Sequence, residues 1–209
     1  EMSPLFRQLS RIESTIPGWM KTEDALCFSL ILNIQSAAGI AGNILEIGVM
    51  WGKLAAVLVG HLKEGEHLYL ADLFDEVVEG CNDEYSVHPS TDDVLENILK
   101  GSGKEHAQTI SMIKGPSKYL HPADLAPVRF VHVDGGHSFD DCLVDLEIAI
   151  KCTVTGGMIA VDDYAHPRFP GVTGAVDAFL KKHAEVQVVG DFNRQGAYGR
   201  KIFLIRSTG

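Results

Sequence analysis

Short apolar runs alternate with helix-like segments along most of the chain. NILEIG, EHLYLAD, QTISMIKG, VRFVHVD and GGMIAVDD are read as continuously apolar strands, and LAAVLVGHL, STDDVLENILK, FDDCLVDLEIAI and GVTGAVDAFLKKH are read as helices. A strand covered on both faces is apolar throughout, whereas a strand with one wet face alternates between apolar and polar residues. The pattern therefore predicts a mostly parallel sheet with helices on both sides.

The two ends of the chain depart from this alternation. The first forty residues predict two helices, one around residues 5–12 and one from Thr22 to about Gly39, with a break at Pro17-Gly18. At the other end, EVQVVGDF and RKIFLIRS are joined too tightly for a helical crossover, which predicts an antiparallel hairpin. We expect one compact domain with a Rossmann-like, doubly wound α/β fold and a seven-stranded sheet. Its parts would be a helical cap over residues 1–42 and a sheet domain over residues 43–209.

Composition and charge narrow the classes of partner. The chain has 209 residues, of which 45% are hydrophobic, enough for one well-buried domain. A formal charge of −10 argues against a nucleic-acid partner. No apolar run is long enough for a membrane span, and the start has no signal-peptide pattern. The four cysteines lack zinc-site spacing and fit reduced thiols. We therefore expect a cytoplasmic protein that acts on small molecules.

In a doubly wound sheet, ligands bind beyond the carboxyl ends of the strands. The first predicted strand ends in EIGVMWG, which contains Glu46, Gly48 and Gly52. The glycines allow a tight turn and a close approach of a ligand to the backbone, and the following helix offers free N–H donors. The stretch is not the dinucleotide pattern GxGxxG, because Met50 stands in place of the middle glycine.

Two further strand ends carry single polar candidates. Asp72 follows the second strand, where a carboxylate can accept hydrogen bonds from both hydroxyls of a ribose; a solvated loop residue is an equal alternative. Ser117 follows the third strand, and its hydroxyl either caps the next helical turn or contacts an adenine edge. The residues themselves favour the cap slightly.

Three carboxylates end the fourth and fifth strands: Asp134, Asp162 and Asp163. Side by side they would repel one another strongly unless a cation lay among them. Oxygen ligands of this kind suit Mg²⁺, Mn²⁺ or Ca²⁺ better than zinc, so the pattern favours a metal site over helix caps. Asp140 and Asp141 are instead expected in the first turn of the helix behind Ser138.

Among the histidines, His137 is best placed for chemistry because it lies three residues after Asp134. His132 lies within the strand and points away from its neighbours, so it is expected to be a satisfied core residue. His166, in the loop after the fifth strand, is a weaker candidate for lining the pocket.

The ordered set of motifs resembles class I S-adenosylmethionine-dependent methyltransferases. It consists of Glu46-x-Gly48-x-x-x-Gly52, Asp72, Gly115-x-Ser117, HVDGGH, GGMIAVDDY and PGVTGAVDAF, with the closing hairpin. More narrowly, it is similar to the metal-dependent O-methyltransferases that act on sugar hydroxyls of macrolides and related natural products. The resemblance covers about residues 43–206. Its most specific part is the pairing of DGGH with DDY and the PGV helix.

This resemblance implies roles for individual residues. Glu46 and Gly48 would frame the methionine part of S-adenosylmethionine, Asp72 would bind its ribose and Ser117 would lie near its adenine. His137 matches the general base of relatives with a DGxH sequence, whereas other relatives carry a second Asp in place of Gly136. The implied cofactor positions are Glu46, Gly48, Gly52, Asp72, Ser117 and Asp134, and the implied metal positions are Asp134, Asp162 and Asp163.

The implied chemistry is methyl transfer to a small hydroxylated compound. A divalent cation such as Mg²⁺ would lower the pKa of the acceptor hydroxyl, and His137 would remove its proton. The alternatives are a catechol-type O-methyltransferase, a nicotinamide oxidoreductase and a binding domain without turnover. The acceptor and the roles of Trp51 and the segment 74–89, a candidate lid, stay open. Relatives associate through N-terminal helices, and residues 25–34 are apolar enough for such an interface, which leaves the oligomeric state open.

Overall fold

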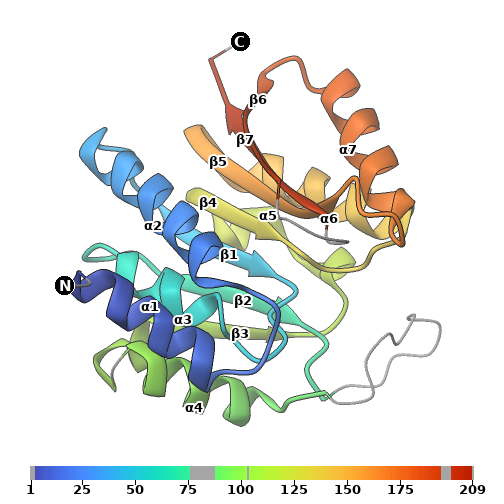
Figure 1. The fold of residues 1–209 in the computed structure, drawn as a ribbon. Coiled ribbons are helices and arrows are strands. Elements are labelled where there is room, and N and C mark those ends of the chain that lie inside the picture. The colour runs from blue at the N-terminus through green and yellow to red at the C-terminus, as the bar shows by residue number, and fades with distance from the viewer. Residues whose placement is uncertain (1–2, 76–87, 103, 194–198, 209) are drawn as a thin grey trace.

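A computed structural model describes residues 3–75, 88–102, 104–193 and 199–208. Within these ranges the strands form one seven-stranded sheet in the order β3-β2-β1-β4-β5-β7-β6 (Figure 1). The first five strands pair in parallel, and β7 is antiparallel to both β5 and β6. The strands are β1 (Asn43–Ile47), β2 (Leu68–Asp72), β3 (Ile110–Lys114), β4 (Val128–Val133), β5 (Thr153–Tyr164), β6 (Val186–Asn193) and β7 (Arg200–Arg206). The predicted doubly wound sheet and its closing hairpin are confirmed.

Helices cover both faces of this sheet and bury two hydrophobic clusters. On one face lie α1 (Pro4–Thr15), α2 (Thr22–Ala37), α3 (Ala55–Leu58) and α4 (Thr91–Ser102). On the other face lie α5 (Pro122–Leu125), α6 (Phe139–Cys152) and α7 (Pro170–Lys182). Short 3₁₀ segments η1 (Val59–His61), η2 (Lys104–Thr109) and η3 (Ser117–Tyr119) connect these elements. The helical turn expected at Ser117 is η3. The sequence pattern did not predict α5 or η2, because each is one or two turns of helix without an apolar period.

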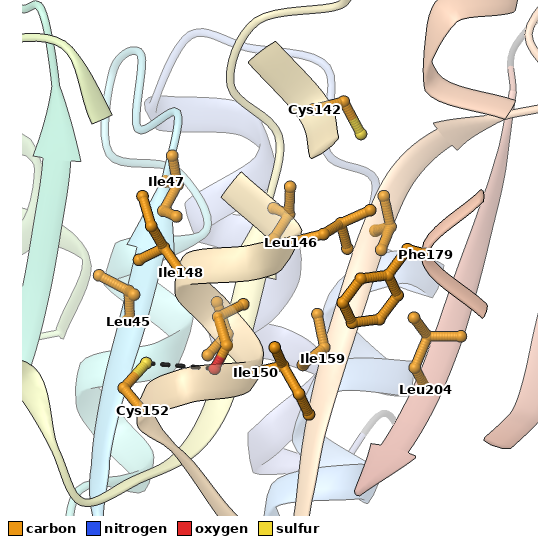
Figure 2. Packing of buried hydrophobic residues seen from close by; sticks show 14 of the residues in the cluster. Leu45, Ile47, Cys142, Leu146, Ile148, Ile150, Cys152, Ile159, Phe179 and Leu204 are labelled. Carbon is orange, nitrogen blue, oxygen red and sulfur yellow. Dashed lines mark hydrogen bonds between the residues drawn. The ribbon is translucent and has the colours of Figure 1, made fainter. Parts of the chain in front are cut away.

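The cluster on the α5–α7 face packs α6 and α7 against the central strands (Figure 2). Leu45 and Ile47 of β1, Ile159 of β5 and Leu204 of β7 contribute from the sheet, and Phe179 of α7 is fully buried among them. Each fully buried large apolar side chain contributes roughly 1.5–3 kcal/mol to stability. The side chains of alternate strand residues therefore define this face, and the residues between them point to the other face.

The N-terminal helices share the second cluster with the sheet. Leu9 and Ile12 of α1 and Phe28 of α2 are buried in the same cluster as Ile44 of β1 and Phe130 of β4. On its outer side, α2 exposes Leu30, 62% accessible, so apolar surface does occur in the stretch considered for association.

No helix among the described residues is long and apolar enough to cross a membrane. Most of the proposed lid, residues 76–87, lies outside the described residues.

A buried ion pair anchors the amino-terminal end of the sheet, far from the strand ends that ligands use. Arg129 of β4 is fully buried and binds both carboxylate oxygens of Glu66, with nitrogen–oxygen distances of 2.9–3.2 Å. Its remaining donors reach Oε1 of Gln35, at 3.2 Å, and the carbonyl of His61, at 2.7 Å. Glu66 also accepts the backbone N–H of Gly42 at 3.0 Å. The pair is therefore satisfied and joins α2, η1 and β4.

Candidate active site

One row of residues crosses four strands just beyond the hydrophobic core. The register aligns Ile47, Val133, Val161 and Ile202, all of which point to the α5–α7 face. Because side chains alternate along a strand, the adjacent residues point to the α1–α4 face. This row consists of Gly48, Asp134, Asp162 and Lys201.

A pocket lies over the row and opens to solvent. It is lined by the row, by Glu46 and His132 from the sheet, by the turn after β1 and by the segment 17–20. The predicted positions that line it are Glu46, Gly48, Asp134 and Asp162.

The turn after β1 depends on glycine at two positions. Gly48 has φ of 85°, and a Cβ there would lie 1.9 Å from the carbonyl oxygen of Asp134. Gly52 has φ of 75°, and its Cβ would lie 3.0 Å from side-chain atoms of Val94 and Ile98 in α4. The predicted tight turn is therefore present. Its glycines allow close packing of backbone against the loop after β4 and against α4.

Asp72 holds this turn in place. Its Oδ2 accepts the backbone N–H groups of Val49, at 2.6 Å, and Met50, at 2.8 Å. Its Oδ1 accepts those of Leu73, at 2.6 Å, and Phe74, at 3.4 Å. A carboxylate has about four acceptor positions, so a ribose would have to share or replace these bonds. Asp72 thus stabilises the turn by accepting its backbone N–H groups, and its role in binding a ribose stays a prediction.

Trp51 and Lys53 join the turn to the N-terminal segment. Trp51 is half-buried, lines the pocket and packs against the cluster of the α1–α4 face. The Lys53 ammonium donates to the carbonyl oxygens of Glu13, at 3.1 Å, and Gly18, at 2.7 Å. The segment 17–20, which forms one wall of the pocket, is therefore tied to the turn after β1.

Glu46 is a buried carboxylate at the bottom of the pocket. Its Oε2 has no hydrogen-bond partner among the described residues. Burial raises the pKa of Glu46 well above its ordinary value, Asp134 and Asp72 add to the rise, and Lys201 opposes it. His132 Nδ1 lies 3.7 Å from Oε1 of Glu46. His132 was expected to be a satisfied core residue; it is buried, but the face to which it points is the pocket.

Lys201 forms an ion pair with Asp162 that the sequence analysis did not anticipate. Both side chains are nearly inaccessible, 3% exposed for Lys201 and 10% for Asp162. The ammonium also lies 5.5 Å from the centre of the Phe28 ring. The sequence signal is a lysine directly before the apolar run IFLI in the strand RKIFLIR, and its partner is 39 residues away.

His137 and Asp163 form a second pair at the edge of the row. Nε2 of His137 lies 3.3 Å from Oδ2 of Asp163, whose backbone has φ of 58°. The His137 ring stacks on Phe169 at 4.0 Å between ring centres, and His166 stacks on the same ring at 4.5 Å. Two rings at these distances occupy opposite faces of Phe169. Thus His166 is buried against Phe169, while His137 faces a carboxylate.

The predicted metal carboxylates divide between two groups that share Asp134. One group joins His132, Asp134 and Asp162, and the other joins Asp134, His137 and Asp163; ligand atoms within each group lie within 4.8 Å of one another. Asp162 and Asp163 are consecutive, but the pairing of β5 with β7 is irregular here and Asp163 has φ of 58°, so the two carboxylates belong to different groups. Carboxylate oxygens with an imidazole nitrogen are suitable ligands for a divalent cation. The donor chemistry fits a metal, but Lys201 already holds Asp162.

Asp140 and Asp141 lie in the first turn of α6, as predicted. Ser138 caps this helix and accepts the backbone N–H of Asp141 at 3.1 Å. A Cβ on Gly136 would lie 2.6 Å from Cβ of Asp141. The space beside Gly136 is therefore filled by the start of α6.

Asp145 of α6 is a second buried carboxylate, and it lies directly under the loop after β4. A Cβ on Gly135 would lie 2.5 Å from its Oδ2, and neither carboxylate oxygen has a hydrogen-bond partner that meets normal geometry among the described residues. Burial raises the pKa of Asp145 to about 7; the Ser117 hydroxyl opposes the rise and Asp141 adds to it.

Ser117 begins η3 and makes no side-chain cap, so the preference for a cap was wrong. Its placement near an adenine stays a prediction.

Asp145 predicts a dependence of stability on pH. Its pKa is about 7 in the folded chain and 3.8 in the absence of the fold, so the folded chain binds the extra proton between these values. The free energy of unfolding should therefore decrease as the pH rises from about 4 to about 7 and then level off. Relative to Asp145→Asn, the wild-type value should decrease by about 2 kcal/mol between about pH 5.5 and about pH 7.5, measured by urea denaturation. A difference that does not change with pH would contradict the raised pKa.

Comparison with known proteins agrees with this geometry. Residues 45–164 match the family model of a methyltransferase domain. Among solved structures, the O-methyltransferase NovP is similar with a TM-score of 0.73 and 16% identity, over 90% of this chain and 81% of that chain. The O-methyltransferase TomG from Streptomyces achromogenes, solved in complex with SAM, has a TM-score of 0.64 and 15% identity, over 100% and 92% of the two chains. CalS11, a TDP-rhamnose 3'-O-methyltransferase, has a TM-score of 0.64 and 14% identity, over 98% and 96%.

These structural likenesses show a shared fold, since the identities are low. No match was found among curated protein sequences. The family model, however, spans more than half of the chain, from β1 through the end of β5, and includes Glu46, Asp72, Asp134, His137 and Asp162. The chain therefore belongs to the methyltransferase-domain family.

Proposed function

We propose that the chain transfers the methyl group of S-adenosylmethionine to a hydroxyl of a small molecule. The observation that carries this proposal is the pocket beyond the strand ends of a methyltransferase domain, with a buried and only partly satisfied Glu46 at its bottom. The cofactor is a sulfonium cation that also carries an ammonium group. A pocket with three carboxylates on its walls favours such a ligand.

The cofactor would lie along the turn after β1. Oε2 of Glu46 has an open acceptor position for the ammonium of the methionine part. A bound ammonium would favour the charged form of Glu46, against the burial that raises its pKa. A hydrogen bond to a charged group contributes about 1.5–3 kcal/mol, so this carboxylate would account for a sizeable share of cofactor affinity. Gly48 lets the backbone of this turn pack against the loop after β4 at the edge of the pocket. Gly52, Asp72 and Ser117 would complete the cofactor site as the resemblance implies.

His137 would remove the proton from the acceptor. Asp163, 3.3 Å from Nε2, and the stacked Phe169 fix the orientation of the imidazole, which is what a general base needs. The acceptor oxygen then attacks the methyl carbon, the carbon–sulfur bond breaks, and its electron pair stays on sulfur. The leaving thioether is neutral, so no acid has to protonate it.

A divalent cation would be held by Asp134 and Asp163, with Asp162 when Lys201 leaves it. When bound, such a cation lowers the pKa of a hydroxyl that it contacts. One imidazole nitrogen cannot hold a metal and accept a proton at once. The proposal therefore keeps the carboxylates as the metal ligands and His137 as the base.

The acceptor is proposed to be a hydroxylated small molecule, such as a sugar or a related natural product. Three structural neighbours are O-methyltransferases by name, and one of them acts on TDP-rhamnose. A nicotinamide oxidoreductase is disfavoured, because the turn lacks the middle glycine that lets a pyrophosphate approach. The test is an assay with S-adenosylmethionine labelled in its methyl group and a panel of hydroxylated acceptors, in which the label should move to an oxygen.

A further inference from the structure

Lys201 places an ammonium group in the protein interior, where a charge is unfavourable unless it is paired. The residue is 2% exposed and lies on β7 beside the end of β5. Lysine is almost never buried to this extent unless it is paired, because removing an ammonium from water costs several kcal/mol. Its partner is Asp162, a member of the carboxylate row. The pair is therefore part of the pocket and not of the protein surface.

The surroundings of this ammonium are strongly acidic. Glu46, Asp134 and Asp162 line the same pocket, and His132 lies among them. Lys53 lines the pocket as well, but its ammonium binds two backbone carbonyls at the other wall. Among the described residues that line the pocket, Lys201 is thus the cationic side chain that is paired with a carboxylate of the row.

The Lys201 ammonium lies beside the position that a divalent cation bound by Asp134 and Asp162 would have to occupy. Asp162 and Asp134 offer ligand atoms within 4.8 Å of each other, so a cation between them would lie next to the Lys201 ammonium. Two cations at such a distance repel strongly in a poorly solvated site. A divalent ion that uses Asp162 must therefore displace Lys201, or Lys201 must exclude the ion.

We propose that the Lys201 ammonium partly neutralises Asp134 and Asp162 when no metal is bound, and that it competes with a divalent metal for Asp162. This inference rests on the proposed function, because it takes Asp134, Asp162 and Asp163 as the ligands of the metal. While the pair is intact, a metal has only Asp134 and Asp163 as carboxylate ligands from the predicted set. The ammonium thereby weakens metal binding and keeps the row partly neutralised when no metal is bound.

The test measures metal binding alone, without cofactor or acceptor. Titration of the full chain with Mn²⁺, followed by electron paramagnetic resonance of the free ion, gives a dissociation constant. Lys201→Met removes the charge and preserves the length of the side chain, so it should bind Mn²⁺ about ten-fold more tightly than wild type, or better, because ligand charge sets affinity in such sites. Lys53→Met removes one charge from the same pocket without freeing a carboxylate and should have a much smaller effect.

Two further variants separate competition from a general effect of charge or folding. Lys201→Gln is a polar substitute in case the methionine variant does not fold, and it should also bind Mn²⁺ more tightly. In Lys201→Met/Asp162→Asn the freed carboxylate is gone, so the gain should disappear. The proposal is wrong if the folded Lys201 variants bind Mn²⁺ no more tightly than wild type, or if the double variant keeps the gain. Because no methyl transfer is measured, a failure of this test can be told apart from a failure of the proposed function.

Discussion

Replacing His137 by alanine should lower kcat by about 10²–10⁴-fold, the range in which a positioned general base contributes. The physical reason is that His137 is held at 3.3 Å from Asp163 and stacked on Phe169, an arrangement that orients one nitrogen for proton transfer. Binding of S-adenosylhomocysteine, measured by calorimetry, should not change, because His137 does not line the wall that contains Glu46. Added imidazole should restore part of the rate.

His166 provides the matched control for this variant. It stacks on the same Phe169 ring, at 4.5 Å, but its Nδ1 accepts the backbone N–H of Arg168. Its hydrogen bond to Asp163 runs from its backbone N–H to the Asp163 carbonyl, at 3.1 Å, and does not involve the imidazole. His166→Ala should therefore lower thermal stability while kcat changes far less than in His137→Ala. If the two variants lost activity equally, or if imidazole failed to restore any rate to His137→Ala, the role would be structural packing and another group would remove the proton.

Replacing Arg129 by methionine should lower the free energy of unfolding by about 3–5 kcal/mol, because one partner of a buried ion pair is left without compensation. The Glu66 carboxylate would lose three close contacts to the guanidinium, and the carbonyl of His61 and Oε1 of Gln35 would lose their donor. Urea denaturation followed by circular dichroism measures the change. The effect should change little between low and high salt, since the side chains are only 0% (Arg129) and 7% (Glu66) exposed and are screened much less than a surface pair.

An exposed ion pair and a paired substitution serve as controls. Lys100 and Glu96 are one turn apart on α4 and about two-thirds exposed, so Lys100→Met should cost well under 1 kcal/mol. Arg129→Met/Glu66→Met removes both charges and should recover much of the lost stability. A loss below about 1 kcal/mol in Arg129→Met would contradict the view that this pair anchors the sheet.

The fold was predictable because its signals are local. Continuous apolar runs such as NILEIG can only be buried on both faces, and the short connection before RKIFLIRS excludes a crossover helix. The strand ends followed from this pattern, which is why Glu46, Asp134 and Asp162 were found as residues of one pocket. Ser138 was likewise predicted as the start of α6, because a cap is read from adjacent residues.

The pairing of side chains was not predictable, because it depends on register and on distant partners. Lys201 meets Asp162 only because β7 aligns with β5, and Arg129 meets Glu66 across 63 residues. The division of Asp162 and Asp163 between two groups follows from the local backbone at the end of β5, where Asp163 has φ of 58°. The occupation of Asp72 by the N–H groups of the turn also has no local signal.

The most direct test of the central claim is the fate of one labelled methyl group. The chain is incubated with S-adenosylmethionine carrying a ¹³C methyl and with nucleotide sugars, sugar-bearing natural products and phenols, and the product is examined by NMR. We predict a new methyl signal on an oxygen of the acceptor, lost in His137→Ala and retained in His166→Ala. A label found on nitrogen, carbon or sulfur of the acceptor, or a folded protein that does not bind S-adenosylhomocysteine, would contradict the account.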